Sequence, residues 1–210
     1  MNTSVFIRPV KERLYQYPEL YQLLRRIRFL LKSIPYLFQS YTPSSDNTQL
    51  ILGSSQKIPR WMTYDIAPGA DYLGNITRLK IFPDSSMTKV YASHVLEHVT
   101  CDEAKIALRE IHRILKPSGE IFIAVPDLEN MSQLFQTEFS RLALDIMFGV
   151  NRRLSDWQPQ HKYGYTRAIL KQELEEAGFT DIQTFEPFID DTTQRYVNDV
   201  MVSICLKSRK

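Results

Sequence analysis

Two short apolar runs and the amphipathic segment between them form the clearest pattern in the chain. Residues 89–94 are rich in β-branched and aromatic side chains and are not interrupted by a turn residue, which predicts a buried strand. Residues 121–125 form a second apolar run that is too short for a helix. Between the two runs, apolar residues recur at helical spacing at Ala104, Ala107, Leu108, Ile111 and Leu115. The pattern predicts a strand–helix–strand unit whose helix buries one face.

The predicted helix has start and stop signals. Thr100 and Glu103 have the spacing of a capping box, so we expect the helix to begin at Thr100. Pro117 cannot continue a helix, and Gly119 supplies the turn into the second strand. Strands that alternate with amphipathic helices indicate a parallel sheet, in which ligands bind beyond the carboxyl ends of the strands. Here those ends carry Ser93, His94, Glu97 and His98 after the first strand, and Pro126, Asp127 and Glu129 after the second.

Two further strands are predicted upstream of this unit. Residues 50–52 form a short apolar run that ends at the turn Gly53-Ser54-Ser55. Residues 61–66 (WMTYDI) are expected to be the next strand because they fit a pattern of the family that the central motifs resemble, and Asp65 then falls at the strand end. The run 56–60 between them is too short for a full crossover helix. We therefore expect the chain to pass directly from the first strand to the second.

The second half of the chain continues the alternation. Residues 131–148 read as a long amphipathic helix, and Thr166 is placed to cap a helix that ends at Gly178. Residues 182–188 and 200–206 are predicted to be the last two strands. Residues 150–165 lack a regular pattern and include His161, as functional loops often do.

The first 48 residues differ in character from the rest. They carry seven Lys and Arg residues against three acidic ones. From Pro18 onward they predict an amphipathic helix with an apolar stripe and an arginine-rich opposite side. Such a helix can pack on its own domain, lie on an anionic membrane surface, or contact a partner such as a second copy of the chain. Residues 41–48 read as a linker, so we divide the chain into a helical extension at 1–48 and a main domain at 49–210.

Composition narrows the class of protein. The 210 residues are 43% hydrophobic with a formal charge of +2, which is typical of a soluble globular protein and does not favour a nucleic-acid partner. Cys101 and Cys205 are too few for a disulfide framework and lack metal-binding spacing, so a cytoplasmic protein is expected. Neither a secretory signal nor an apolar stretch long enough to span a membrane is recognisable.

The central motifs resemble a known family. Residues 91–99 (YASHVLEHV) and 103–129 (EAKIALREIHRILKPSGEIFIAVPDLE) are similar to the middle of class I S-adenosylmethionine-dependent methyltransferases of the type-11 group. The resemblance implies an α/β fold with a Rossmann-like, mostly parallel sheet of order 3-2-1-4-5-7-6, including an antiparallel edge strand. It also implies S-adenosylmethionine as the cofactor.

The resemblance also implies where the cofactor would bind. A glycine turn after the first strand lets the backbone approach the methionine part, and a carboxylate after the second strand can accept hydrogen bonds from both ribose hydroxyls. Asp65 occupies the position of this carboxylate, although it could instead cap its own turn. Asn75 could lie near the adenine or could stabilise the turn in which it lies. The residues assigned to the cofactor are Gly53, Ser54, Ser55, Asp65, Ile66, Asn75, Ser93 and His94.

Methyl transfer from a sulfonium is an in-line displacement that needs alignment and water exclusion more than a fixed catalytic residue. If the acceptor is a hydroxyl or an amine, a base assists, and His98 and His161 are the two candidates. Each of them could instead order a loop through hydrogen bonds. Ser93, Glu97 and His98 overlap a metal-binding pattern of some quinone-pathway relatives. Two adjacent side chains do not easily reach one ion from a regular helix, so no metal is expected.

These observations lead to one hypothesis and one rival. The hypothesis is a cytoplasmic methyltransferase that acts on a small molecule or a glycan-type precursor. The rival is an inactive methyltransferase-fold protein that serves as a binding or scaffold module, because only Gly53 remains of the family's glycine-rich turn. The two differ in whether Ser54, Ser55 and Gln56 leave a hollow at this turn or fill it.

Overall fold

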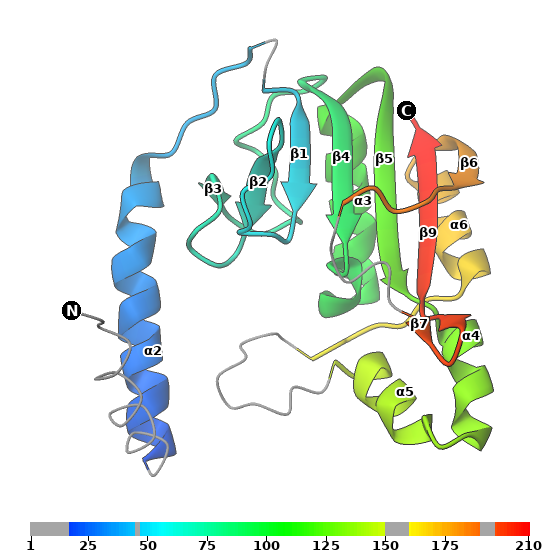
Figure 1. The fold of residues 1–210 in the computed structure, drawn as a ribbon. Helices are drawn as coiled ribbons and strands as arrows, with labels where there is room; N and C mark the ends of the chain where they lie inside the picture. The colour runs from blue at the N-terminus through cyan, green and yellow to red at the C-terminus, as the bar shows by residue number, and fades with distance from the viewer. Residues whose placement is uncertain (1–16, 45–46, 150–159, 190–195) are drawn as a thin grey trace. The chain divides into compact units, whose positions relative to one another are not determined.

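The computed structural model describes residues 17–44, 47–149, 160–189 and 196–210 (Figure 1). The chain divides into two compact units, Met1–Gln39 and Ser40–Lys210. Tyr41, which lies in the predicted linker, is buried and packs its ring against Phe82 with the centroids 5.2 Å apart. The second unit therefore includes this residue in its core.

A seven-stranded sheet organises the second unit. Its order is β3-β2-β1-β4-β5-β9-β6, and all neighbouring strands are parallel except at β9, which runs antiparallel to both β5 and β6. The order and the antiparallel strand confirm the predicted Rossmann-like methyltransferase sheet. The strands are β1 (Gln49–Leu52), β2 (Met62–Asp65), β3 (Tyr72–Leu73), β4 (Met87–Ser93), β5 (Leu115–Pro126), β6 (Thr180–Thr184) and β9 (Ser203–Arg209). Two short strands, β7 (Tyr196–Val197) and β8 (Val200–Met201), form a separate ribbon.

Helix α3 (Cys101–Ile114) connects β4 to β5 and begins as predicted. The Thr100 side chain accepts a hydrogen bond from the Glu103 backbone N–H, while the Glu103 carboxylate accepts one from the Thr100 N–H at 2.9 Å. Helix α6 (Arg167–Glu176) begins at the predicted cap Thr166, whose hydroxyl accepts from the Ile169 N–H. A single turn of 3₁₀ helix, η2 (Leu96–His98), joins β4 to α3. Both predicted helix starts are confirmed.

The prediction of one long helix over residues 131–148 is wrong. The segment forms α4 (Leu128–Ser132), the 3₁₀ turn η3 (Gln133–Gln136) and α5 (Ser140–Met147). The break lies at Thr137, whose hydroxyl donates to the Leu134 carbonyl at 2.7 Å and accepts from the Phe139 N–H at 3.1 Å. A threonine that bonds to nearby backbone groups competes with the helical ladder, which explains the interruption.

The predicted last strands are displaced along the chain. Strand β6 ends at Thr184, and β9 begins only at Ser203. Phe185 and Phe188 instead pack on the sheet, where their ring centroids lie 5.3 and 5.0 Å from that of Phe122. In Figure 1 this segment crosses in front of β9, β5 and β4, while α3 and α6 lie behind the sheet. These ring contacts, together with the burial of Ile189, stabilise this path over a longer strand.

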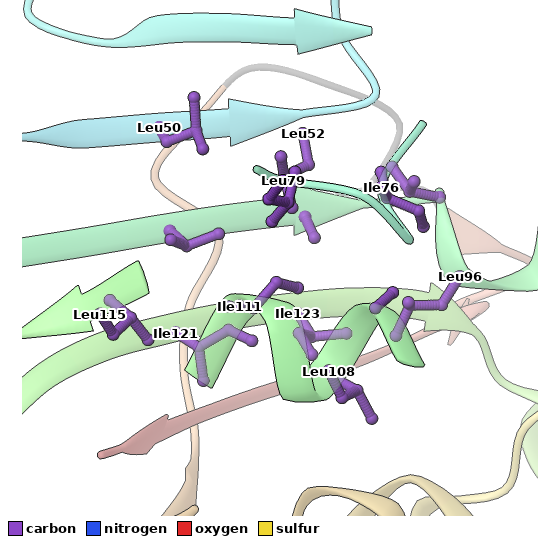
Figure 2. Packing of buried hydrophobic residues seen from close by; sticks show 14 of the residues in the cluster. Leu50, Leu52, Ile76, Leu79, Leu96, Leu108, Ile111, Leu115, Ile121 and Ile123 are labelled. Atoms are coloured by element: carbon purple, nitrogen blue, oxygen red, sulfur yellow. The ribbon is translucent and has the colours of Figure 1, made fainter. Parts of the chain in front are cut away.

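The alternating side chains of the strands build a core on each face of the sheet. Leu50, Leu52 and Ile121 pack with Leu108 and other residues of α3 in the larger core, as Figure 2 shows. Ile51, Tyr91 and Phe122 point to the opposite face and form a smaller, aromatic-rich core. Because β1, β4 and β5 are buried on both faces, their carboxyl ends are held in fixed positions.

The first unit contains α2 (Pro18–Ser33), followed by the 3₁₀ turn η1 (Ile34–Phe38). The predicted helix is confirmed, and Glu19 in its first turn and Lys32 in its last match the helix dipole. The predicted apolar stripe is exposed at Leu20, Leu23, Leu24, Ile27, Leu30, Leu31 and Ile34. No helix among the described residues is long and apolar enough to cross a membrane.

Candidate functional site

A cavity of about 520 Å³ lies at the carboxyl ends of β1, β2 and β4. Its walls come from the turn after β1, the end of β2, the turn after β3 and the segment that joins β4 to α3. Ser54, Ser55 and Gln56 line the cavity and do not fill it. The complete lining is Gly53, Ser54, Ser55, Gln56, Asp65, Ile66, Ala67, Asn75, Ile76, His94, Val95, His98, Val99, Glu103 and Lys162.

Gly53 is required by the protein itself. Its φ is +75°, in the left-handed region, and a Cβ at this position would lie 2.1 Å from Cγ2 of Val95. The sequence argument assigned this glycine to close contact with a ligand, and the structure adds a close contact with Val95 of the cavity wall. Gly53 therefore lets the turn after β1 pack against the residue that follows β4.

Asp65 serves its own turn and also lines the cavity. Its Oδ1 accepts a hydrogen bond from the Ala67 N–H at 2.7 Å, so the carboxylate caps the turn, as one reading of the sequence allowed. Burial raises the pKa of Asp65, while the backbone N–H groups of Ala67 and Ile66 oppose the shift. The cap fixes the carboxylate at the cavity wall, where it can accept hydrogen bonds from a ligand hydroxyl.

Asn75 has a similar double role. Its Oδ1 accepts hydrogen bonds from the Thr77 N–H and hydroxyl, both at 3.0 Å, which fixes the turn after β3. The residue borders the cavity beside Ile76 and faces a wall that includes Ile66 and Ala67. A flat heteroaromatic ring would find apolar contacts and an amide in this part of the cavity.

The end of β4 contributes His94 to the cavity, whereas Ser93 is not among the lining residues. His94 has a φ of +53°, the left-handed conformation, which turns the chain at the strand end. Its Nδ1 lies 3.0 Å from Oε1 of Glu97 and its Nε2 lies 3.2 Å from the Ser203 hydroxyl. With both ring nitrogens engaged, His94 is a fixed part of the wall.

Of the two predicted catalytic histidines, His98 lines the cavity and His161 does not. The structure nevertheless brings them together, with ring centroids 4.8 Å apart and the planes at 70°. His161 Nδ1 donates to the Met147 carbonyl at 2.9 Å. Burial lowers the pKa of His161, although the Glu97 carboxylate opposes the shift. At neutral pH this imidazole is therefore uncharged.

The sequence reasoning did not identify several members of the site. Glu97 was noted for its place after the strand, but nothing in the sequence indicated that its side chain is fully buried. Glu103 was identified as a helix cap and also borders the cavity. Lys162 follows His161, and its backbone N–H donates to the Glu97 carbonyl at 2.7 Å. This contact over 65 residues of sequence separation has no local signal.

Comparison with known proteins identifies the fold. Residues 58–123 match a family model that describes a methyltransferase domain. Solved structures of S-adenosylmethionine-dependent methyltransferases are similar to the chain over most of its length. The one from Archaeoglobus fulgidus has 18% identity and a TM-score of 0.52, and the alignment covers 90% of this chain and 100% of that one. The chain has the class I S-adenosylmethionine-dependent methyltransferase fold.

Other comparisons agree with this assignment. The methyltransferase structure from Methanosarcina mazei has 13% identity and a TM-score of 0.54, and the alignment covers 82% of this chain and 99% of that one. The one from Mesorhizobium loti has 14% identity and a TM-score of 0.50, with 85% and 98% covered. No curated protein matches the chain in sequence.

The cavity fits the cofactor that this methyltransferase fold implies. Its volume lies in the range of about 300–1,000 Å³ typical of small-molecule sites. Asp65, Asn75 and the turn after β1 border it together, and Gly53 lets that turn pack against Val95 of the cavity wall. Eight residues were assigned to the cofactor. The six other than Ser93 and His94 lie on the turn after β1, at the end of β2 or on the turn after β3, and all six line the cavity.

Proposed function

We propose that the protein transfers a methyl group from S-adenosylmethionine to a small molecule or a glycan-type precursor. The open cavity at the strand ends supports this proposal most directly, because the shortened glycine turn leaves it unfilled. An inactive scaffold would not need a hollow that a fixed carboxylate and two imidazoles border. The scaffold reading is for this reason the weaker of the two.

In this proposal the two sides of the cavity have different tasks. Asp65 accepts the ribose hydroxyls, and Asn75 and Ile76 contact the adenine. The turn that begins at Gly53 holds the amino-acid part. The side that carries His98 remains for the acceptor. This division follows the chemistry of the lining residues, since carboxylates accept hydroxyl hydrogen bonds and imidazoles exchange protons near neutral pH.

The cofactor would supply the activated methyl group. The residues of this chain align the acceptor with it and limit the access of water. A hydroxyl or amine acceptor must also lose a proton. We assign this task to His98, which borders the cavity, whereas His161 acts on His98 from outside the lining.

Isothermal titration with S-adenosylmethionine and S-adenosylhomocysteine tests the proposal. We expect the native chain to bind both, and Asp65→Ala to reduce affinity by at least about 10- to 100-fold, because the loss of even one charge-assisted hydrogen bond costs roughly 1.5–3 kcal/mol. Asp102→Ala, which removes an exposed carboxylate on α3, serves as the control and should bind like the native chain. No binding at millimolar ligand would refute the proposal, and an unchanged affinity in Asp65→Ala would place Asp65 outside the cofactor site.

For the N-terminal unit, we propose contact with an anionic membrane surface. Its support is the exposed apolar stripe of α2 together with the arginines on the same helix. Co-sedimentation with phosphatidylserine vesicles should fall when Leu23 and Leu30 are both replaced by Glu. Equal sedimentation of the two forms would show that the helix has no membrane role. A change in molecular mass between the two forms without vesicle binding would instead favour self-association.

A further inference from the structure

Three of the four histidines of the chain gather around one carboxylate. His94 Nδ1 lies 3.0 Å from Oε1 of Glu97, and His161 Nε2 lies 3.9 Å from the same oxygen. One ligand atom each from Glu97, His98 and His161 lies within 4.8 Å of the others. The sheet and the helices form the surrounding core without these imidazoles. The fold alone therefore does not explain why three imidazoles gather here.

Glu97 lacks the partners that a buried carboxylate needs. Its residue is 0% exposed, and no lysine or arginine among the described residues pairs with it. His94 satisfies Oε1, but Oε2 is buried without a hydrogen-bond partner in the described part of the chain. Buried charges are normally paired or coordinate a metal. The second oxygen of Glu97 therefore points to a missing ligand.

His98 shows the same deficit. Its Nδ1 is buried and has no hydrogen-bond partner among the residues that the structure describes. His98 and Glu97 are neighbours in the 3₁₀ turn η2, which replaces the regular helix that the sequence argument assumed. Two unsatisfied polar atoms from adjacent residues thus occur in the same cluster, and each has a lone pair to offer.

His161 is oriented as metal-bound histidines are. Its Nδ1–H donates to the Met147 carbonyl, which leaves the lone pair on Nε2, the atom nearest Glu97. Its backbone N–H donates to the Phe148 carbonyl at 3.2 Å. A Cβ at Gly149 would lie 2.7 Å from the imidazole Cδ2, so only glycine lets the chain pack this closely on the ring. The end of α5 therefore fixes both the tautomer and the place of this imidazole.

We propose that Glu97, His98 and His161 bind one divalent transition-metal ion, with Zn²⁺ as the ion of choice. Two imidazoles and one carboxylate form a ligand set that Zn²⁺ uses with a fourth position open. Mg²⁺ and Ca²⁺ prefer sites made of oxygen ligands, which this cluster does not offer. Bond lengths of about 2.0–2.2 Å require the three atoms to move somewhat closer together on binding, which side-chain rotation can provide.

The position of the ion follows from its ligands. His98 borders the cavity, while Glu97 and His161 are not among its lining residues. The ion would join the segment after α5 to the turn after β4, and its open position would face the side that the proposed function assigns to the acceptor. A His98 imidazole that binds the ion through Nδ1 carries its proton on Nε2, so in the ion-loaded chain the ion would replace His98 in helping the acceptor to lose its proton. In this respect the inference rests on the proposed function, although the ion site itself does not. His94 would hold the ligating carboxylate from outside the coordination sphere, through Oε1.

The test uses the untagged full chain, stripped with a chelator and titrated with Zn²⁺ in competition with a chromophoric indicator. We expect one tight ion per chain and a weakening of at least about 100-fold in His98→Ala and in His161→Ala, since loss of a ligand exceeds the 10- to 100-fold effect of outer partners. His112→Ala is the matched control, because this fourth histidine packs on Phe179 outside the cluster. Glu97→Gln, which keeps the shape of the side chain, is the additional variant if an alanine variant does not fold.

Co²⁺ provides a second measurement, because a four-coordinate site gives an intense visible absorption that the variants should lack. Absence of tight Zn²⁺ binding to the native chain, or equal binding in all variants, would overturn the proposal. Binding of S-adenosylhomocysteine is measured on the same preparations. A chain that binds the nucleoside but no zinc refutes the ion site alone, whereas one that binds zinc but no nucleoside refutes the proposed function alone.

Discussion

The contact between Gly53 and Val95 predicts a specific, testable coupling between two residues of the cavity wall. Gly53→Ala places a methyl group where the backbone φ is +75° and where Cγ2 of Val95 would be 2.1 Å away. The left-handed backbone conformation itself costs about 1–2 kcal/mol for a residue with a Cβ, and we call this cost the conformational term. Cγ1 and Cβ of Val95 would both lie 3.3 Å from the new atom, so rotating the valine exchanges one close contact for another. Overpacking of this kind costs roughly 1–3 kcal/mol.

The two terms together predict a loss of about 2–5 kcal/mol in the free energy of unfolding for Gly53→Ala. For a chain of this size, each kcal/mol corresponds to roughly 2–4 °C in Tm. Val95→Ala alone should destabilise by about 1–2 kcal/mol through lost apolar burial. In the double variant both Cγ atoms are gone and only the contact with the Cβ of residue 95, at 3.3 Å, is left, so most of the steric term is removed while the conformational term remains. Its destabilisation should therefore be about 1–3 kcal/mol smaller than the sum of the single variants.

Urea unfolding of the native chain, the two single variants and the double variant measures this coupling. Gly69→Ala combined with Val95→Ala is the control. Gly69 also has a positive φ, of +128°, but its Cβ would approach nothing nearer than 3.4 Å, so this pair should be additive. Additivity of Gly53→Ala and Val95→Ala within about 0.5 kcal/mol would show that the contact does not exist in solution. The reasoning about the glycine turn would then be refuted.

Three further predictions concern other parts of the chain. Thr100→Ala removes the cap of α3 and should lower the free energy of unfolding by about 1 kcal/mol, whereas Thr100→Ser should retain it; thermal denaturation distinguishes them. Arg113→Lys should destabilise by roughly 1–3 kcal/mol in urea unfolding, because Lys cannot replace the bonds to the Phe82 and Leu79 carbonyls and to Glu110 together. Burial lowers the pKa of His112 below 6.5, so the folded state binds fewer protons than the unfolded state. Its contribution to stability is present above pH 6.5 and is lost as the pH falls through the lowered pKa. The Tm of His112→Gln should fall less than that of the native chain between pH 7 and pH 5, and parallel curves would contradict this.

Local signals in the sequence were sufficient for the centre of the fold. The capping box at Thr100 acts within four residues, and the alternation of strand and helix fixes the parallel sheet through chain connectivity. The antiparallel place of β9 came from the resemblance to a family, not from any local pattern. The predicted helix over residues 131–148 failed because periodicity does not report the competing hydrogen bonds of Thr137.

The part of the candidate site that is built from strand ends was also predictable from the sequence. Residues on the turns after β1, β2 and β3 lie at positions that strand ends define, and the structure gathers them around one cavity. The environment of Glu97 was not predictable, because it depends on Lys162 and His161 from a distant segment. The contact of Gly53 with Val95 was not predictable, since the closeness of Val95 depends on how two strands are placed side by side.

The place of β9 has a consequence for how the protein folds. Among the strands that the structure describes, β6 pairs only with β9, and β9 separates it from β5, which ends 77 residues before β9 begins. Pairings between distant segments form slowly, because the intervening chain must be ordered first. The half of the sheet from β3 to β5 can assemble early, while β6 has no strand beside it until Ser203–Arg209 arrive. An intermediate with an open edge at β5 should therefore accumulate during refolding, and chaperone binding would be directed to that edge.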